Sequence, residues 1–247
     1  MALRRKPNGS AVTLPRAGFH PRSRKGAPRA PLSRERIEAA AIGLIERESY
    51  ENFSIRKLAA ELRCEAMSIY HYFPSRQHIM DALVDRMLAE VAIPTDELTP
   101  LEQIRELAIS YRRMALRYPE FQRHFAFHRL NTPGGIRWIA GVLAVVARLG
   151  GGTEVTARLF RAFGYYITGA ALDETSGYAR GQSAAEPVPD DVVARDFPAV
   201  AAVNPFFQKD QHEKTFLLGL DFMLDGAARL TGPAPRKRGS GRRKFRS

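Results

Sequence analysis

Residues 54–78 read Ser-Ile-Arg-Lys-Leu-Ala-Ala-Glu-Leu-Arg-Cys-Glu-Ala-Met-Ser-Ile-Tyr-His-Tyr-Phe-Pro-Ser-Arg-Gln-His. This stretch holds two short helical patterns around a four-residue break, and a third helix is expected to start directly after it. In the first pattern, Ile55, Leu58 and Leu62 recur at three- and four-residue spacing, so they share one face that must be buried. The second pattern is about two turns long and needs neighbours to be stable in water. This arrangement is typical of a helix-turn-helix that reads DNA.

The second short helix is expected to have a buried side and an exposed side. The side chains predicted to point inward are Ile69, Tyr70 and Phe73. The side chains predicted to point outward are Met67, Ser68 and His71. Serine bonds several bases, methionine packs on a thymine methyl and histidine reaches a purine acceptor, so the outward set suits base edges in a major groove. Ala66 is a further candidate for contact with a methyl group.

Leu32 to about Val91 resembles the N-terminal DNA-binding domain of the TetR family of bacterial transcriptional regulators. The specific part of the match is the Ile-Tyr-x-Tyr-Phe-x-Ser-Arg run at residues 69–76, which is similar to the family's usual Leu-Tyr-x-His-Phe-x-x-Lys. Arg63 and Cys64 depart from the pattern, because the family commonly has Gly-Val at this turn. If residue 63 is left-handed, arginine costs roughly 1 kcal/mol relative to glycine.

The resemblance also indicates which side chains position the protein on the DNA backbone. Tyrosine hydroxyls and arginine forks suit phosphate oxygens. The residues assigned to this role are Arg56, Tyr70, Tyr72 and Arg76. For Tyr70, the inward core position is an equal alternative. Ser54, whose hydroxyl is predicted to cap the first short helix, completes the expected DNA-binding set.

The resemblance implies an all-α fold, in which an N-terminal three-helix helix-turn-helix domain is joined by a long helix to a C-terminal helical ligand-binding and dimerisation domain. It implies a homodimer on a near-palindromic operator in double-stranded DNA, most often a repressor, which a small-molecule effector releases. In the family the last two long helices build the dimer interface. Small residues that would permit close approach there are Gly164, Gly169, Gly219 and Gly226. Core packing within a monomer is the alternative.

No alternating pattern bounded by hairpin turns occurs in the sequence, so the chain is predicted to be all-α. The helices expected outside the motif cover about residues 33–48, 75–92, 100–117, 119–129, 133 to the glycines at 150–152, 153–172 and 208–230. Residues 174–204 are expected to form a long loop with one short helix near 190–202. The expected domains are a helix-turn-helix domain at 33–78 and a ligand-binding and dimerisation domain at 79–231.

The formal net charge of +12 is concentrated near the two ends of the sequence. Residues 1–32 contain eight Lys and Arg, residues 232–247 contain seven, and the rest carries 23 basic against 26 acidic residues. Both segments lack the apolar content needed to fold, so we expect a disordered basic arm at 1–32 and a disordered basic tail at 232–247. The arm could follow the DNA backbone or enter the minor groove. A solvated segment, or a start codon placed too early, is the alternative.

A ligand pocket is expected among the helices of residues 100–172. Aromatic walls favour an apolar or aromatic ligand, although aromatic residues at helical spacing also form ordinary cores. The candidate lining residues are Tyr111, Phe121, Phe125, Trp138, Phe160, Phe163 and Tyr166. His124 and His128, with Glu120, have the spacing of a metal pair on one helix face, but no third ligand is identifiable. We therefore expect neither a metal nor another cofactor.

Two functions are compatible with these observations. The first is a ligand-responsive transcriptional regulator; the alternative is a DNA-binding protein with a purely dimerising or partner-binding C-terminal domain and general DNA affinity from its basic arms. They differ in whether an apolar cavity exists. An enzyme is not expected, because there is no glycine-rich phosphate loop, no nucleophile elbow and no evident pair of carboxylates. The longest apolar run, 138–147, is about half a membrane span, so we expect a cytoplasmic protein.

Overall fold

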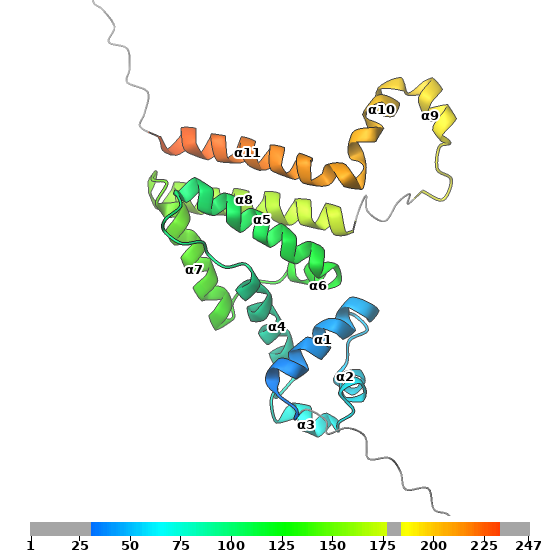
Figure 1. The fold of residues 1–247 in the computed structure, drawn as a ribbon, viewed down its shortest axis with the longest axis vertical. Coiled ribbons are helices and arrows are strands. Elements are labelled where there is room, and N and C mark those ends of the chain that lie inside the picture. The colour runs from blue at the N-terminus through cyan, green and yellow to red at the C-terminus, as the bar shows by residue number, and fades with distance from the viewer. Residues whose placement is uncertain (1–30, 177–183, 233–247) are drawn as a thin grey trace, which may run out of the picture. The chain divides into compact units, whose positions relative to one another are not determined.

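The computed structural model describes residues 31–176 and 184–232, and the regular structure in these ranges is entirely helical (Figure 1). This confirms the predicted all-α fold. The expected basic arm and tail lie almost wholly outside the described ranges. Within those ranges no single helix is long and apolar enough to cross a membrane. Pro133–Ala147 and Gly152–Thr175 together reach that length and apolar character, but the two helices are bent by 116° relative to one another.

The first three helices form what we call the reading head: α1 (Arg34–Glu48), α2 (Ile55–Leu62) and α3 (Ala66–Tyr70). The next helix, α4 (Arg76–Glu90), follows directly. The hydroxyls of Ser33, Ser54 and Ser75 accept backbone N–H groups at the starts of α1, α2 and α4. Each cap satisfies a donor that the first helical turn leaves unpaired, which is why these helices begin where the sequence predicts.

The core of the reading head consists of completely buried aliphatic and aromatic side chains. Those with no exposed surface include Ile37, Ile45, Leu58, Ile69 and Phe73. α3 has only five residues, so it depends on tertiary packing for its stability. Ile69 and Phe73 supply that packing, and their burial agrees with the inward orientation expected of them.

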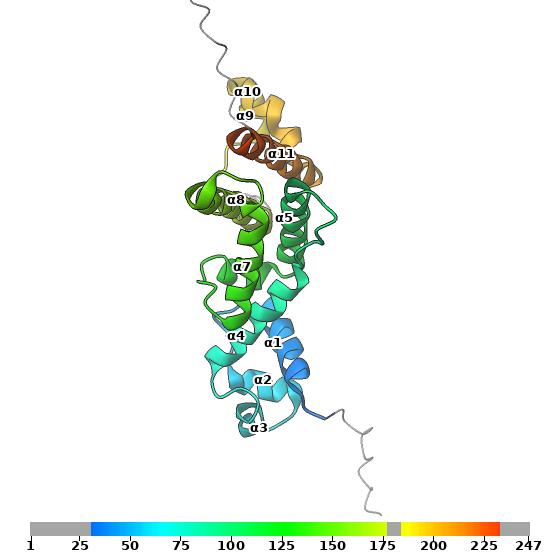
Figure 2. The same cartoon turned by 90° about the vertical axis from the view of Figure 1, so that its left-hand side faces the viewer.

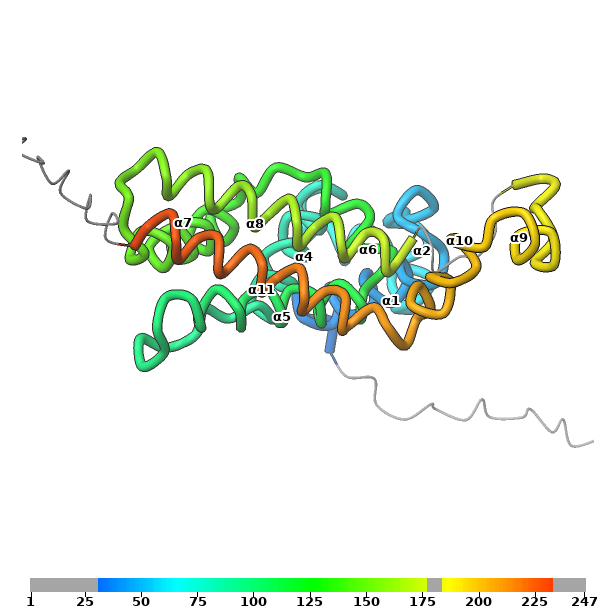
Figure 3. The backbone as a smooth tube through the Cα atoms, turned by 90° about the horizontal axis from the view of Figure 1, so that it is seen from above, coloured from blue at the N-terminus to red at the C-terminus, as the bar shows by residue number. Residues whose placement is uncertain are grey.

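The remaining long helices form what we call the C-terminal bundle: α5 (Pro100–Arg117), α6 (Pro119–Phe125), α7 (Pro133–Ala147), α8 (Gly152–Thr175) and α11 (His212–Thr231). α4 packs against α1, α5 and α7, and so joins the reading head to the bundle (Figure 2). α8 packs against α5 and α7, and α11 lies along α5 and α8 (Figure 3). Thr99 and Thr132 cap α5 and α7, each followed by proline in the first helical position.

Two helix boundaries in the bundle differ from the expected ones. α6 ends at Phe125 rather than near residue 129, because Thr132 donates to Asp85 of α4 at 2.5 Å and residues 126–131 serve as the connection to this anchor. α8 starts one residue before Thr153, after Gly151 with φ 89°. Glycine accepts this left-handed geometry without strain, so Thr153 is not the cap.

The segment before α11 is more helical than expected. It contains two short helices, α9 (Asp190–Asp196) and α10 (Pro198–Val203), where one was predicted. Two 3-10 turns at Asn204–Phe207 and Lys209–Gln211 then delay the start of α11 to residue 212. Neither α9 nor α10 contains a buried residue, so this segment is no part of the core.

Candidate DNA interface and ligand cavity

The predicted base-reading side chains lie on α3 and at its end. Met67 is 66% exposed, His71 is also exposed, and Ala66 and Ser68 are half-buried. The exposed thioether of Met67 is notable, because large apolar side chains in the head are otherwise mostly buried. α3 therefore offers a small, accessible set of side chains of the kind that a major groove accommodates.

The structure corrects the inward orientation expected for Tyr70. Its side chain is 39% exposed, whereas Ile69 and Phe73 fill the interior completely. The guanidinium of Arg34 closes this interior, since it lies 4.2 Å from the centre of the Phe73 ring and donates to the backbone oxygen of Tyr72 at 2.7 Å. Tyr70 is left at the rim of α3, where a phosphate contact is possible.

Arg76 has a different environment from the one expected of a phosphate-binding side chain. Its guanidinium donates to the hydroxyl of Tyr50 at 3.0 Å and to the backbone oxygen of Tyr50 at 3.1 Å. The same group lies over the Tyr50 ring at 4.5 Å and over the Phe53 ring at 5.5 Å. Arg76 therefore ties the start of α4 to the α1–α2 loop, a structural role that sequence reasoning did not predict; its contact with phosphate stays a prediction.

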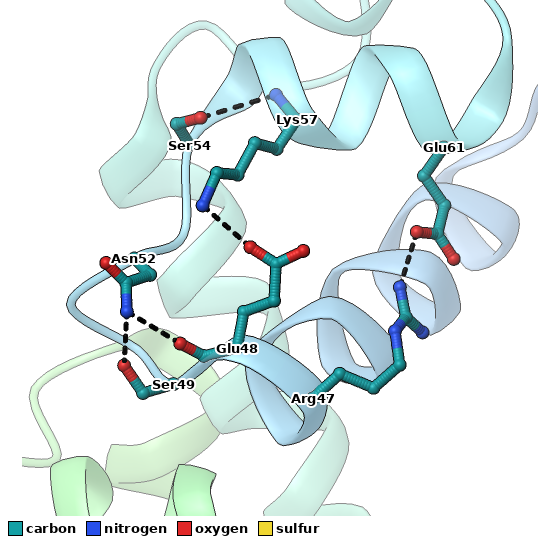
Figure 4. Close-up of polar contacts among 7 residues, drawn as sticks. All are labelled: Arg47, Glu48, Ser49, Asn52, Ser54, Lys57 and Glu61. Carbon is teal, nitrogen blue, oxygen red and sulfur yellow. Dashed lines mark hydrogen bonds and ion pairs between the residues drawn. The ribbon is translucent and has the colours of Figure 1, made fainter.

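The other residues expected to contact the DNA backbone are Ser54, Arg56 and Tyr72. Ser54 caps α2 by accepting from Lys57 N at 3.3 Å, Arg56 is exposed, and Tyr72 is half-buried. Lys57, which sequence reasoning did not include, donates to Glu48 of α1 at 2.6 Å (Figure 4). Paired in this way, Lys57 links α2 to α1.

The turn between α2 and α3 contains the strain that the sequence suggested. Arg63 has φ 53° and ψ 48°, which is the left-handed conformation that the family's usual glycine would adopt freely. The turn is nevertheless well bonded, since Arg63 N and Cys64 N donate to Ala60 O and Ala59 O at 3.1 and 3.0 Å. The departure from the family pattern therefore changes the energy of the turn and not its geometry.

The C-terminal bundle contains a cavity of about 520 Å³ that is partly open to solvent, between α4, α5, α7, α8, the end of α6 and the chain that follows it. This volume lies within the usual range for small-molecule sites. Five predicted residues line the cavity: Tyr111, Phe125, Trp138, Phe160 and Phe163. The aliphatic part of the lining, which sequence reasoning missed, includes Ile104, Leu107, Ile136, Ile139, Val142 and Val146. Helical spacing shows that such residues are buried but not whether they face a filled core or a cavity.

Two predicted lining residues lie elsewhere. Phe121 is fully buried and stacks on Phe125 with ring centres 5.8 Å apart, so it supports the wall from behind. Tyr166 faces α11, where its hydroxyl donates to Phe216 O at 2.6 Å and its ring packs closely over Gly219. Gly219 is therefore required by packing within one chain, whereas a side chain at Gly164, Gly169 or Gly226 would meet open space.

Few polar groups line the cavity, and most of them already make hydrogen bonds within the protein. Trp138 donates its indole N–H to Val91 O at 2.8 Å, and Gln122 donates to the Tyr111 hydroxyl at 3.0 Å. Burial raises the pKa of Tyr111, so this phenol stays neutral. The cavity therefore selects for apolar surface and provides a small number of fixed hydrogen-bonding positions.

A carboxylate connects the reading head to the helix that forms one wall of the cavity. Glu46 of α1 accepts from Glu120 N at 3.1 Å and from Phe121 N at 2.9 Å, at the start of α6. Burial raises the pKa of Glu46, although the N–H of Phe121 opposes this effect. A negative charge at a helix N-terminus is favourable, and α6 continues to Phe125 in the cavity wall. One helix thus contacts both functional regions.

The two histidines of α6 and its extension lie beside this junction. His124 stacks on Tyr50 with ring centres 3.3 Å apart and lies 4.0 Å from the His128 ring. Burial, together with the neighbouring His128 and Arg76, lowers the pKa of His124 to about 4. In the described part of the chain, no three His, Cys, Asp or Glu side chains converge as a metal ion would need.

Two family models match this chain. Residues 37–83 match the model for bacterial regulatory proteins of the tetR family, and residues 94–230 match the tetracyclin repressor-like C-terminal domain. The first match covers the reading head with most of α4, and the second covers the bundle with its cavity.

Relatives of known identity agree with these matches. An HTH-type transcriptional regulator of Saccharopolyspora erythraea is 24% identical over 205 residues, which cover 81% of this chain and 86% of the relative. The tetracycline repressor protein class G of Vibrio anguillarum is also 24% identical over 205 residues, covering 81% and 95%. The structure of ActR from Streptomyces coelicolor in complex with (S)-DNPA is 26% identical, with a TM-score of 0.63 over 82% of this chain and 100% of ActR.

The C-terminal family model alone spans more than half of the chain, and the N-terminal model coincides with the exposed α3 and its supporting helices. Sequence, fold and site therefore lead to one assignment: the chain belongs to the TetR family of bacterial regulatory proteins and is a DNA-binding transcriptional regulator.

Proposed function

We propose that the protein is a homodimeric, ligand-responsive repressor that binds a near-palindromic operator and leaves it when a small apolar or aromatic molecule fills the cavity. The observation that carries this proposal is a largely apolar cavity of about 520 Å³ in the same chain as a complete reading head. The names of the relatives support it, since they include a tetracycline repressor and a regulator solved with a bound small molecule. The protein acts in the cytoplasm and has no catalytic activity of its own.

On the operator, α3 enters the major groove and its exposed side chains read the bases. The residues at base edges are Ala66, Met67, Ser68 and His71. The residues at the phosphates are Ser54, Arg56, Tyr70 and Tyr72. Arg76 joins them at the phosphates and also fixes the α1–α2 loop. Domain bounds of 33–78 for DNA binding and 79–231 for ligand binding and dimerisation follow from this division of tasks.

The dimer forms through α8 and α11. Leu218, Phe222 and Leu230 lie at four- and eight-residue steps on α11 and are 55%, 68% and 60% exposed, so they form an apolar stripe. Gly226 lies in the same stripe and leaves it open to close approach. On α8, a side chain at Gly164 or Gly169 would likewise meet open space. An apolar stripe of this size marks a protein interface, and a two-fold dimer places two copies of α3 in successive major grooves.

Release follows from linkage between the cavity and the head. A ligand displaces the equilibrium only if it binds one arrangement of the heads more tightly than the other. Phe125 in the cavity wall and the start of α6 on Glu46 belong to one short helix, so a ligand that moves Phe125 also acts on α1. The helix is the physical route for this coupling.

The test is a polarisation titration of the full-length protein against a duplex from directly upstream of its own gene, with a random duplex as competitor. We expect tight binding that survives the competitor and is lost when Ser68→Ala and His71→Ala are combined. Arg113→Ala on the exposed side of α5 is the control and leaves binding unchanged. Equal affinity for both duplexes, abolished by salt and by deletion of residues 1–32, would replace the proposal with general, arm-driven DNA binding.

A further inference from the structure

The charged residues that line the cavity all have one sign. Its lining, which lies wholly within the described residues, includes Arg129 and Arg161 but no aspartate or glutamate. Both arginine side chains are exposed, so their charges lie at the opening of the cavity and not in its interior. Two guanidinium groups at the rim of a low-dielectric cleft create a positive potential that attracts anions.

Neither arginine is neutralised by a carboxylate within residues 31–176 and 184–232. Neighbouring arginines differ in this respect. Arg158, one turn before Arg161 on α8, pairs with Glu154 at 2.7 Å, and Arg112 of α5 pairs with Glu174 at 2.7 Å. A guanidinium without a carboxylate partner has its charge-assisted donors available for a planar anion such as a carboxylate.

Arg161 is also held in a defined position. Its Nε donates to the hydroxyl of Tyr165 at 3.0 Å, and its guanidinium lies 5.2 Å from the centre of that ring. Its two terminal nitrogens make no hydrogen bond within the described residues. A side chain that is already ordered loses less conformational freedom on binding, so its interaction with a ligand is stronger.

Apart from the two arginines, the polar side chains of the lining are His128, Thr168 and the polar groups of Tyr111, Tyr165 and Trp138. Tyr111 is a neutral phenol bonded to Gln122, and the indole N–H of Trp138 is committed to the backbone. A buried carboxylate without partners loses its hydration and is strongly disfavoured there. A charged ligand must therefore keep its anionic end at the opening and place its apolar body inside.

We infer that the effector is an aromatic acid, whose ring system lies against Phe125, Trp138 and Phe163 and whose carboxylate is bound by Arg161 and Arg129. This inference rests on the proposed function, because it names the chemical class of ligand for the same cavity. The aromatic walls explain affinity for the rings, and the arginines at the rim explain orientation and the preference for an acid over a neutral molecule.

The experiment uses two probes of equal shape, anthracene-2-carboxylate and anthracene-2-carboxamide, with the full-length protein. Trp138 is the only tryptophan and lines the cavity, so quenching of its fluorescence reports binding. We expect the carboxylate to bind about tenfold more tightly than the amide, and this preference to weaken as salt is added. In R129Q/R161Q the carboxylate affinity falls to that of the amide, while the amide affinity stays unchanged.

The matched control is Arg158→Gln, which removes an exposed arginine on the same helix that is paired with Glu154 and does not line the cavity. It should leave both affinities unchanged. Equal binding of the two probes to the natural protein, or an unchanged preference in R129Q/R161Q, would overturn the inference and leave the ligand cavity of the proposed function intact. Failure of both probes to quench Trp138 would contradict the inference and the proposed function together.

Discussion

The reading head and the C-terminal bundle use their apolar side chains in opposite ways. In the head, Ile37, Leu58, Ile69 and Phe73 are completely buried, and Met67 is the most exposed large apolar side chain. In the bundle, α8 and α11 leave a row of apolar side chains in solvent, and a cavity remains unfilled between the helices. The head is thus complete as a folded unit, whereas the bundle is built to receive a second subunit and a ligand.

The largest effect is expected from a substitution in the core of the reading head. Phe73→Ala removes a fully buried ring from the contact that holds the five-residue α3, and should cost about 3–5 kcal/mol of unfolding free energy. Chemical denaturation followed by circular dichroism measures this loss. Met67→Ala on the exposed side of α3 is the control and should change stability by less than about 0.5 kcal/mol. Similar losses of unfolding free energy in the two variants would show that the buried Phe73 ring does not stabilise the reading head.

The second effect concerns the surface that the bundle leaves exposed. L218E/F222E places two charges on the apolar stripe of α11, which should weaken dimerisation by at least about a hundredfold while the fold of each subunit is kept. Analytical ultracentrifugation measures the association. Arg113→Glu, a charge reversal on the exposed side of α5, should leave the dimer intact. A dimer that persists in the double variant would place the interface elsewhere.

A smaller effect is expected at the contact between the two regions. Glu46→Gln removes the negative charge that the start of α6 receives, which weakens the connection by about 1 kcal/mol. Ligand affinity should stay unchanged, but DNA release should require about fivefold more ligand. Comparison of Trp138 quenching with DNA polarisation separates the two quantities. Glu48→Gln, whose partner Lys57 lies within the head, is the control; equal release midpoints in Glu46→Gln and the natural protein would exclude this route.

The surroundings of His124, where α6 meets the reading head, predict that stability depends on pH. The pKa of His124 is lowered from 6.5 to about 4, first by burial and then by His128 and Arg76, while Glu51 acts in the opposite direction. Between these values the unfolded chain binds a proton that the native protein does not, so stability falls as the pH decreases through this window and levels off below it. Because the ring is only partly buried, solvent screening limits the effect to about 1 kcal/mol.

His124→Phe keeps an aromatic ring against Tyr50 and removes the titrating group. Urea denaturation at pH 7.5 and pH 4.5 should show that this variant loses about 1 kcal/mol less on acidification than the natural protein does. His71→Phe on the exposed side of the head should behave like the natural protein. Identical pH profiles for His124→Phe and the natural protein would mean that folding does not lower the pKa of His124.

The smallest expected effect is a gain in stability within the head. Arg63→Gly relieves the left-handed strain at φ 53°, but glycine also loses more chain entropy on folding, so the net gain should be about 0.5 kcal/mol. Thermal unfolding measures it. Arg56→Gly, inside the right-handed α2, should instead destabilise by about 1 kcal/mol. A loss of stability in Arg63→Gly would show that contacts of the arginine outweigh the strain.

Sequence reasoning succeeded where a local signal determines structure. Ser33, Ser54, Ser75, Thr99 and Thr132 each mark a helix start, because capping is decided by residues within one turn. It left Tyr70 undecided, since an aromatic ring can face either the interior or the DNA, and it did not predict the contacts of Arg76 with Tyr50. The 39% exposure of Tyr70 and the bonds of Arg76 depend on neighbours that lie outside one helical turn.

By itself the sequence determined the all-α fold, the position of the reading helix and the family, because helical periodicity, caps and turn residues act over short distances. The tertiary structure decided what requires helices far apart in the chain. It placed Phe125, Trp138 and Phe163 around one cavity, turned Tyr166 away from it, brought two arginines to its opening, and joined Glu46 to α6. These contacts depend on how helix faces pack against one another, and periodicity along a single helix does not contain that information.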